Sequence, residues 1–188
     1  MHERLDRLYD RLLVLRCQTA DPAAFEELVR RYQPALRRFL RRMLDDEHAS
    51  EDVLQDVWFD VFREVGRLQS LDAFAGWLWR ITRNRAYAVL RRRGTAVESA
   101  MQTLNGVDIA AHVEDPALDA AEQKQLLDAS LTRLTHEQRE VLLLRYVEQL
   151  SYEEIASAVG CELGTVRSRL HYAKAALRTL MERNGFET

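Results

Sequence analysis

The residues with the clearest chemistry lie between positions 163 and 180, near the C-terminal end of the sequence. A helix there would carry hydroxyl, imidazole and cationic side chains on one face, with no carboxylate among them. Such groups donate hydrogen bonds to phosphate oxygens and to the base edges that a DNA major groove exposes. An ordinary solvated basic face is the alternative. The candidate DNA-contacting residues are Thr165, Arg167, Ser168, His171, Tyr172 and Lys174.

A helix-turn-helix would position that face. Ser151 is followed three residues later by Glu154, which predicts a capping box at the start of a first helix. Gly160 follows this helix and can adopt the positive φ that a tight turn needs. A second helix is expected to begin at Gly164-Thr165, where the Thr165 hydroxyl would cap free amides. Its inward stripe would consist of Val166, Leu170, Ala173, Leu177 and Leu180.

A second cationic set lies between Asp72 and Glu98, where the sequence has no acidic residue. On a helix, one side would combine arginines, an asparagine and aromatic rings. That combination suits single-stranded DNA because rings stack on bases while guanidinium groups hold phosphates. The alternative is a core edge closed by the rings, with solvated arginines; Arg85, on the apolar side, is expected to reach a carboxylate of a neighbouring helix. The outer residues are Trp79, Arg80, Arg83, Asn84, Tyr87 and Arg91.

An acidic face with one aromatic residue is predicted on a helix from Ser50 to about Val65. An apolar anchor with a polar rim is typical of protein interfaces, so this face predicts a protein-docking surface. An incidental exposed phenylalanine is the alternative. The docking residues are Asp52, Gln55, Asp56 and Phe59. The opposite, core-facing stripe would contain Val53, Leu54, Val57, Trp58, Val61, Phe62 and Val65.

The elements that carry these surfaces are all expected to be helices. The 188 residues include only 7 Gly and 3 Pro, and no strand-like alternation of useful length occurs. Asp21 and Pro22 suit the N-cap and first position of a helix, which Pro34 is expected to break or kink. An earlier helix ending near Cys17 is indicated by the helical spacing of Leu5, Leu8, Leu12 and Leu15.

Composition restricts the function. A net charge of -3 is unusual for a simple DNA-binding protein, so local basic patches must decide any DNA binding. The N-terminus lacks an apolar signal core and no run reaches membrane-spanning length, which predicts a cytoplasmic protein without membrane insertion. Cys17 and Cys161 form no ligand pattern with histidines, so we expect reduced thiols, no metal and no other cofactor.

An acidic linker is predicted in the middle of the chain. Between Gly94 and Gln123 there is no Lys or Arg, while six carboxylates occur. The predicted division is a first domain at 1–93, a linker at 94–116 and a second domain at 117–188. About twenty extended residues span roughly 65 Å, which would let two domains hold two separated DNA sites.

Five segments, in this order, resemble regions 2 and 4 of the extracytoplasmic-function (ECF) sigma factors of bacterial RNA polymerase, in the sigma-70 family. The resemblance implies an all-α fold, with a region 2 bundle at 1–93 and a region 4 helix-turn-helix at 117–188. It also implies a non-enzymatic protein that directs promoter-specific transcription initiation. The segments are FEELVRRYQPALRRFL, EDVLQDVWFDVF, FAGWLWRITRNRAYAVLRRR, LTHEQREVLLLRYVEQLSYEEIA and GTVRSRLHYAKAAL.

The resemblance also implies a role for each surface. The set from Asp52 to Phe59 would bind the clamp of the largest core polymerase subunit, and the flap of the second largest subunit would be a further contact. The set from Trp79 to Arg91, with the loop 66–72, would recognise and open the minus-ten promoter element. The set from Thr165 to Lys174 would contact the minus-thirty-five element. An anti-sigma factor is an expected partner.

Two positions depart from the pattern of this family. The loop has Leu68-Gln69-Ser70 where many members carry an aromatic residue followed by basic and small ones. Tyr172 stands where an arginine is common. The resemblance therefore leaves open which minus-ten base is captured, and the minus-thirty-five preference can differ from that of other members.

Three other hypotheses explain less of the sequence. A helix-turn-helix regulator that binds DNA without polymerase would leave the second basic and aromatic helix unexplained. An anti-sigma or adaptor protein would need the acidic helix without two DNA-binding faces. An enzyme is disfavoured because no glycine-rich phosphate loop, metal-ligand spacing or nucleophile-base set occurs.

Overall fold

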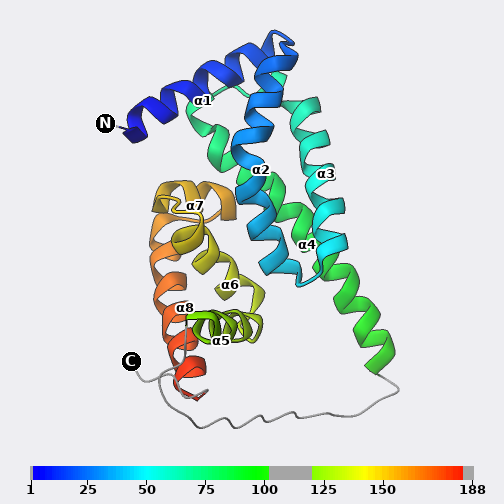
Figure 1. Ribbon diagram of the computed structural model, residues 1–188, viewed down its shortest axis with the longest axis vertical. Coiled ribbons are helices and arrows are strands. Elements are labelled where there is room, and N and C mark those ends of the chain that lie inside the picture. The colour runs from blue at the N-terminus through cyan, green and yellow to red at the C-terminus, as the bar shows by residue number, and fades with distance from the viewer. Residues whose placement is uncertain (1, 102–119, 184–188) are drawn as a thin grey trace.

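The computed structural model describes residues 2–101 and 120–183, and within these ranges the regular structure is helical, without a strand. The expected all-α class is confirmed. None of the helices in these two ranges combines the length and apolarity needed to span a membrane. The α-helices are α1 His2–Gln18, α2 Pro22–Leu44, α3 Glu47–Glu64, α4 Phe74–Met101, α5 Ala120–Thr132, α6 His136–Leu142, α7 Tyr152–Val159 and α8 Leu163–Arg183 (Figure 1).

Helix α2 begins as predicted and continues past its internal proline. The Asp21 carboxylate accepts hydrogen bonds from the amides of Ala23 and Ala24, and Pro22 occupies the first helical position. The predicted break at Pro34 is wrong, since α2 is one helix to Leu44. Buried side chains before and after the proline hold the helix to its neighbours, which offsets the lost backbone hydrogen bond.

Helices α1 to α4 form the N-terminal domain, whose core lies between α2, α3 and α4. The predicted core stripe is largely confirmed, because the α3 valines at 53, 57 and 61 are buried with Leu54, and so is Val65 directly after the helix. Phe62 was placed in this stripe wrongly: it is 66% exposed. Its ring lies at the margin of the stripe, edge-on to Phe25 with 5.3 Å between centroids.

Helices α5 to α8 form the C-terminal domain, which contains the predicted helix-turn-helix in α7 and α8. Capping boxes start α6, at Thr135 and Gln138, and α7, at Ser151 and Glu154. Gly160 ends α7 with φ of 72°, as the predicted turn requires. Helix α8 begins at Leu163, before Thr165, so the expected capping role of the Thr165 hydroxyl is wrong.

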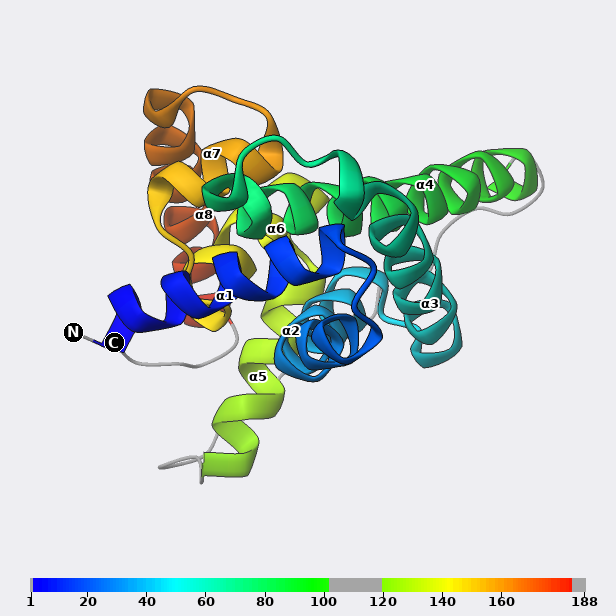
Figure 2. The ribbon, with the colours of Figure 1, turned by 90° about the horizontal axis from the view of Figure 1, so that it is seen from above.

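The two domains pack against each other, chiefly through α4 and α7 (Figures 1 and 2). Arg139 of α6 is 4% exposed, and its Nη1 donates a hydrogen bond of 3.2 Å to the carbonyl of Arg42 in α2. Arg38 of α2 pairs with Glu148 at 2.8 Å. The described residues therefore form one closed arrangement in which the hydrophobic core runs through both domains.

Helix α4 extends further than the sequence indicates. The predicted linker begins at Gly94, but α4 continues through this glycine to Met101. The remainder of the predicted linker, 102–116, lies outside the described residues. The domain boundaries therefore stay predictions.

Candidate nucleic-acid interface

The α8 surface has the arrangement that the sequence predicts. Its apolar stripe is buried at Val166, Leu170 and Ala173. Thr165 is half-buried and its carbonyl accepts a hydrogen bond of 3.0 Å from the Ser168 hydroxyl. The rings of His171 and Tyr172 meet edge-on, with 5.5 Å between their centroids. The exposed candidates are Arg167, Ser168, His171, Tyr172 and Lys174.

The four docking residues on α3 are likewise exposed. Phe59 is 60% exposed, and the Arg63 guanidinium lies over its ring at 5.6 Å. Phe62 adds a second exposed ring, which the sequence reasoning missed because it assigned Phe62 to the core. The remaining members of this surface are Asp52, Gln55 and Asp56.

Arg85 of α4 supports the acidic face of α3, and its expected carboxylate partner is confirmed. Its Nε donates to Asp60 at 2.6 Å, and its Nη1 donates to Asp56 at 3.3 Å. Asp56 nevertheless keeps 61% of its side chain exposed. One cation thus fixes two carboxylates of α3 without covering the surface.

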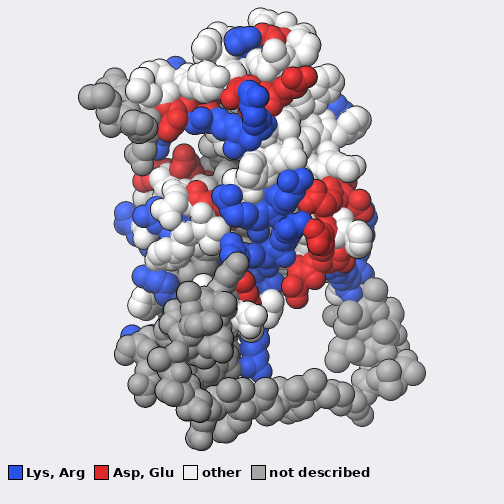
Figure 3. Space-filling view, in the orientation of Figure 1, with Lys and Arg blue, Asp and Glu red and all other residues white. Residues whose placement is uncertain are grey.

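The arginines of α2 are paired with acids instead of forming a separate cationic face. Arg37 binds Glu51 through two hydrogen bonds of 2.7 and 2.9 Å, and Arg41 binds Glu47. Figure 3 shows this arginine band beside the acidic side chains of α3. The contact leaves α3 acidic on the side that faces away from α2.

Trp79 of α4 is buried, so its predicted position on an exposed face is wrong. It is 3% exposed, and its ring meets Phe39 of α2 edge-on at 5.4 Å between centroids. Helical periodicity places Trp79 on the side of α4 opposite its apolar stripe. It cannot show that another element also packs on that side. In the structure, the Trp79 ring packs on α2, and Leu150 and Ser151 of the C-terminal domain line the cleft beside it.

Two further members of the α4 set contact one glutamate of α6. Arg83 Nε lies 2.6 Å from Glu140 Oε1, and the Tyr87 hydroxyl donates to Glu140 Oε2 at 3.0 Å. The Arg83 guanidinium also stacks on the Tyr87 ring at 4.5 Å. Three other members, Arg80, Asn84 and Arg91, are exposed.

Glu140 is fully buried, with 0% of its surface exposed. Burial raises the pKa of its carboxyl above the ordinary 4.5, while Arg83, Tyr87 and Arg169 act in the opposite direction. The sequence reasoning missed Glu140, because a lone glutamate before an apolar run does not reveal a partner in another domain. The feature of the sequence that could have indicated its burial is its position beside Val141 and Leu142, which pack inward.

The loop before α4 forms a pocket with the start of that helix. The Gln18 side chain donates hydrogen bonds to the carbonyls of Val65 at 3.2 Å and Leu68 at 2.8 Å, which fixes the loop. The pocket has a volume of about 490 Å³. Its walls are Glu64, Arg67, Leu68, Gln69, Ser70, Trp77 and Arg80.

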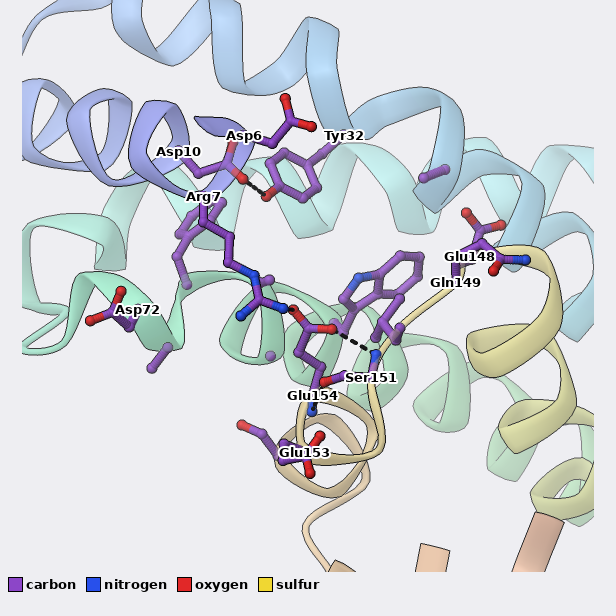
Figure 4. Close-up of a pocket in the computed structure, with 18 of the residues that line it drawn as sticks. Asp6, Arg7, Asp10, Tyr32, Asp72, Glu148, Gln149, Ser151, Glu153 and Glu154 are labelled. Atoms are coloured by element: carbon purple, nitrogen blue, oxygen red, sulfur yellow. Dashed lines mark hydrogen bonds and ion pairs between the residues drawn. The ribbon is translucent and has the colours of Figure 1, made fainter. Parts of the chain in front are cut away.

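A larger cleft of about 890 Å³ lies between the two domains. Figure 4 shows Glu154 of α7 between the Arg7 guanidinium and the Ser151 amide, and the Tyr32 hydroxyl directed at Asp10. The Glu148 side chain in its wall is 1% exposed, and burial raises the pKa of its carboxyl. Both domains supply walls, so this cleft depends on the closed arrangement.

Comparison with known proteins agrees with these features. A family model described as sigma-70 region 2 matches residues 28–95, and one described as sigma-70 region 4 matches residues 124–177. The chain is 36% identical over 178 residues to the ECF RNA polymerase sigma factor SigE of Mycolicibacterium smegmatis, covering 90% of this chain and 67% of that protein. It is 32% identical over 176 residues to the RNA polymerase sigma-H factor of Pseudomonas aeruginosa, covering 89% and 91%.

A solved structure has a similar arrangement of helices. The sigma factor RpoE of Bartonella quintana, crystallised with the anti-sigma factor NepR, is 27% identical and superposes with a TM-score of 0.64 over 84% of this chain and 96% of that one. Because sequence, family models and fold agree along most of the chain, this protein belongs to the sigma-70 family, among the ECF RNA polymerase sigma factors.

Proposed function

We propose that this sigma factor binds core polymerase through α3, opens the minus-ten element with α4 and its preceding loop, and contacts the minus-thirty-five element with α8. The observation that carries the proposal is the separation of two chemistries on one chain. Two surfaces offer cations, amides or aromatic rings to nucleic acid, while the third offers carboxylates around exposed phenylalanines.

The α3 surface has the features of a protein interface. Phe59 and Phe62 are its apolar anchors, and Asp52, Gln55 and Asp56 form the polar rim. DNA would be repelled by this rim, whereas a basic helix pair would be attracted. The clamp helices of the largest polymerase subunit are the proposed partner.

The pocket beside α4 suits one unstacked base. Its volume falls in the range of about 300–1,000 Å³ that is usual for ligand pockets. Trp77 offers a ring for stacking, Gln69 and Ser70 offer hydrogen-bonding groups, and Arg80 offers a cation for the adjacent phosphate. Unstacking a base costs a few kcal/mol, which these contacts would offset.

The closed arrangement covers part of the proposed minus-ten surface. Arg83 and Tyr87 contact Glu140, and Trp79 lines the cleft between the domains. We infer that the domains separate when core polymerase and promoter DNA bind, so that Arg83 exchanges a carboxylate for a phosphate. An anti-sigma factor that stabilises the closed arrangement would act as an inhibitor, and the similarity to a sigma factor solved with its anti-sigma factor supports such a partner.

The test is run-off transcription from fragments of the source genome with bacterial core polymerase, alongside DNA binding by the protein alone. We expect initiation that requires both core polymerase and this protein, with little binding by the protein alone. Tight DNA binding without core polymerase and no transcription would instead identify a conventional helix-turn-helix regulator.

A further inference from the structure

An exposed stripe of leucines runs along α1, which lies at the edge of the molecule (Figure 1). Helix α1 is held to the fold by Leu13 and Val14, which are 1% and 0% exposed. The stripe lies on a different side of the helix and faces solvent. Its members are Leu5, Leu8, Leu12 and Leu15, whose exposed fractions are 60%, 51%, 49% and 50% in that order.

The spacing of these four leucines is that of a coiled-coil interface. Steps of three, four and three residues place them at successive a and d positions of two heptads. This stripe, called the leucine seam below, is narrower than the apolar face with which a helix packs on a globular core. The e and g positions beside the seam are occupied by Tyr9, Arg11 and Arg16.

The charges of α1 are divided between its two sides. Its aspartates face α2, where Arg31 lies 3.0 Å from Asp6 and 2.7 Å from Asp10. Two of the three positions beside the leucine seam, Arg11 and Arg16, are basic. In a coiled coil, the charges at e and g select the partner.

The two arginines beside the seam retain capacity for further contacts. Arg11 lies 3.4 Å from Asp72 and Arg16 lies 2.7 Å from Asp21, yet 46% and 47% of their side chains remain exposed. A guanidinium has five N–H donors, so one carboxylate does not saturate it. An acidic side chain across the seam would complete a small charge network.

We propose that the leucine seam binds an amphipathic α-helix of another protein, with apolar residues at three- and four-residue spacing and acidic residues on its flanks. Leucines at a and d would interdigitate with the partner, and carboxylates at its e and g positions would meet Arg11 and Arg16. The proposal does not rest on the promoter or core-polymerase assignments, because α1 carries none of those residues and precedes the matched region 28–95.

Two other occupants fit the seam less well. In a parallel pair of two copies, Arg11 of one copy would face Arg16 of the other, and like charges at these positions repel. A membrane surface favours a helix with a broad apolar face, whereas this seam is only two positions wide per heptad.

The test uses two fluorescein-labelled helical peptides of four heptads, about 28 residues. Both have leucine at a and d; one has glutamate at e and g and the other has lysine. Fluorescence anisotropy with the full chain is expected to give a Kd at least tenfold lower for the glutamate peptide. Leu8→Gln/Leu12→Gln should raise that Kd at least tenfold, and Arg11→Glu/Arg16→Glu should reverse the preference between peptides.

The matched control is Leu127→Gln, which changes a leucine of α5 that is 37% exposed and should leave both Kd values unchanged. All the substituted side chains are at least one-third exposed, and circular dichroism verifies that each variant folds. Equal binding of both peptides, or binding unaffected by Leu8→Gln/Leu12→Gln, overturns the proposal. A dimer in sedimentation equilibrium that this double variant abolishes, or seam-dependent binding to phosphatidylglycerol vesicles, also overturns it in favour of a second copy or a membrane.

Discussion

Individual side chains show where sequence reasoning succeeds and where it cannot. Arg83 and Tyr87 could be proposed as DNA-binding residues from the sequence because their types and helical spacing are local properties. Their contact with Glu140 could not be foreseen, because the partner of Tyr87 lies 53 residues away and is brought near only by domain packing. Trp79 was misassigned because its ring packs on Phe39 of α2, a contact between helices that helical periodicity does not reveal.

Glu140 should make the closed arrangement sensitive to pH. Its pKa is raised above 4.5 in the closed form, so the protonated closed form is favoured at low pH and that advantage is lost as pH rises through the raised pKa. Förster transfer between dyes at Arg30→Cys and Thr179→Cys, with Cys17 and Cys161 changed to serine, measures the closed fraction. We expect the transfer efficiency to fall as pH rises above about 4.5.

The Glu140→Gln variant serves to assign this effect. Its transfer efficiency should vary less with pH, and the residual dependence should come from Glu148, whose pKa burial also raises. An identical pH profile in Glu140→Gln and the parent chain would contradict the assignment to Glu140.

Arg167→Ala is expected to weaken promoter binding by the holoenzyme by about 1–3 kcal/mol, because Arg167 is exposed on the α8 face proposed for the major groove. Binding is measured on promoter fragments with the native and altered upstream element. Arg133→Ala, which removes an exposed arginine outside α8, is the control. If holoenzyme with Arg167→Ala still distinguishes the native from the altered upstream element as well as the parent holoenzyme does, the proposed role of Arg167 in reading this element is refuted.

At the scale of helices, both the ends and the buried sides could be predicted only in part. The caps at Asp21 and Ser151 were correct because a cap contacts amides only two or three residues away, whereas the cap at Thr165 was wrong because α8 begins before it. Helix α2 continues past Pro34, and Phe62 and the α1 leucines are exposed, because neighbouring helices decide those outcomes. An apolar repeat thus locates a helix, but it identified the buried side of α3 and α8 and not that of α1.

The α3 surface is tested by Asp56→Arg. This change replaces a 61% exposed carboxylate with a cation, and Asp60 still pairs with Arg85, so the helix should fold normally. Affinity for core polymerase, measured by fluorescence titration, should fall at least tenfold. Glu153→Arg, an exposed charge reversal on α7, should bind like the parent chain; equal affinity of Asp56→Arg and the parent chain would exclude this part of α3 from the interface.

The contact between α4 and α7 depends on a glycine. A Cβ at Gly76 would lie 2.6 Å from Ser157 Oγ and 2.8 Å from Ser157 Cβ, so Gly76→Ala should force the helices apart. Overpacking of this kind costs about 1–3 kcal/mol. The doubly labelled chain should then show lower transfer efficiency, and adding Ser157→Gly should partly restore it. An unchanged efficiency in Gly76→Ala would show that the two helices accommodate the methyl group without separation of the domains.

At the scale of the whole molecule, the two domains form one closed unit while the proposed activity needs them apart. The ion pair between Arg83 and Glu140 places a carboxylate on a residue of the proposed minus-ten surface, and Arg38 with Glu148 forms a second ion pair between the domains. The sequence could indicate two domains and an acidic linker. It could not indicate the closed arrangement, since that depends on contacts between side chains more than 50 positions apart.

The most direct test of the account is the doubly labelled chain titrated with core polymerase. If α3 binding separates the domains, transfer efficiency should fall on addition of core polymerase, and it should not fall for the Asp56→Arg variant of the same labelled chain. Unchanged efficiency while the parent chain co-sediments with core polymerase would contradict the proposal that binding opens the closed arrangement and uncovers α4.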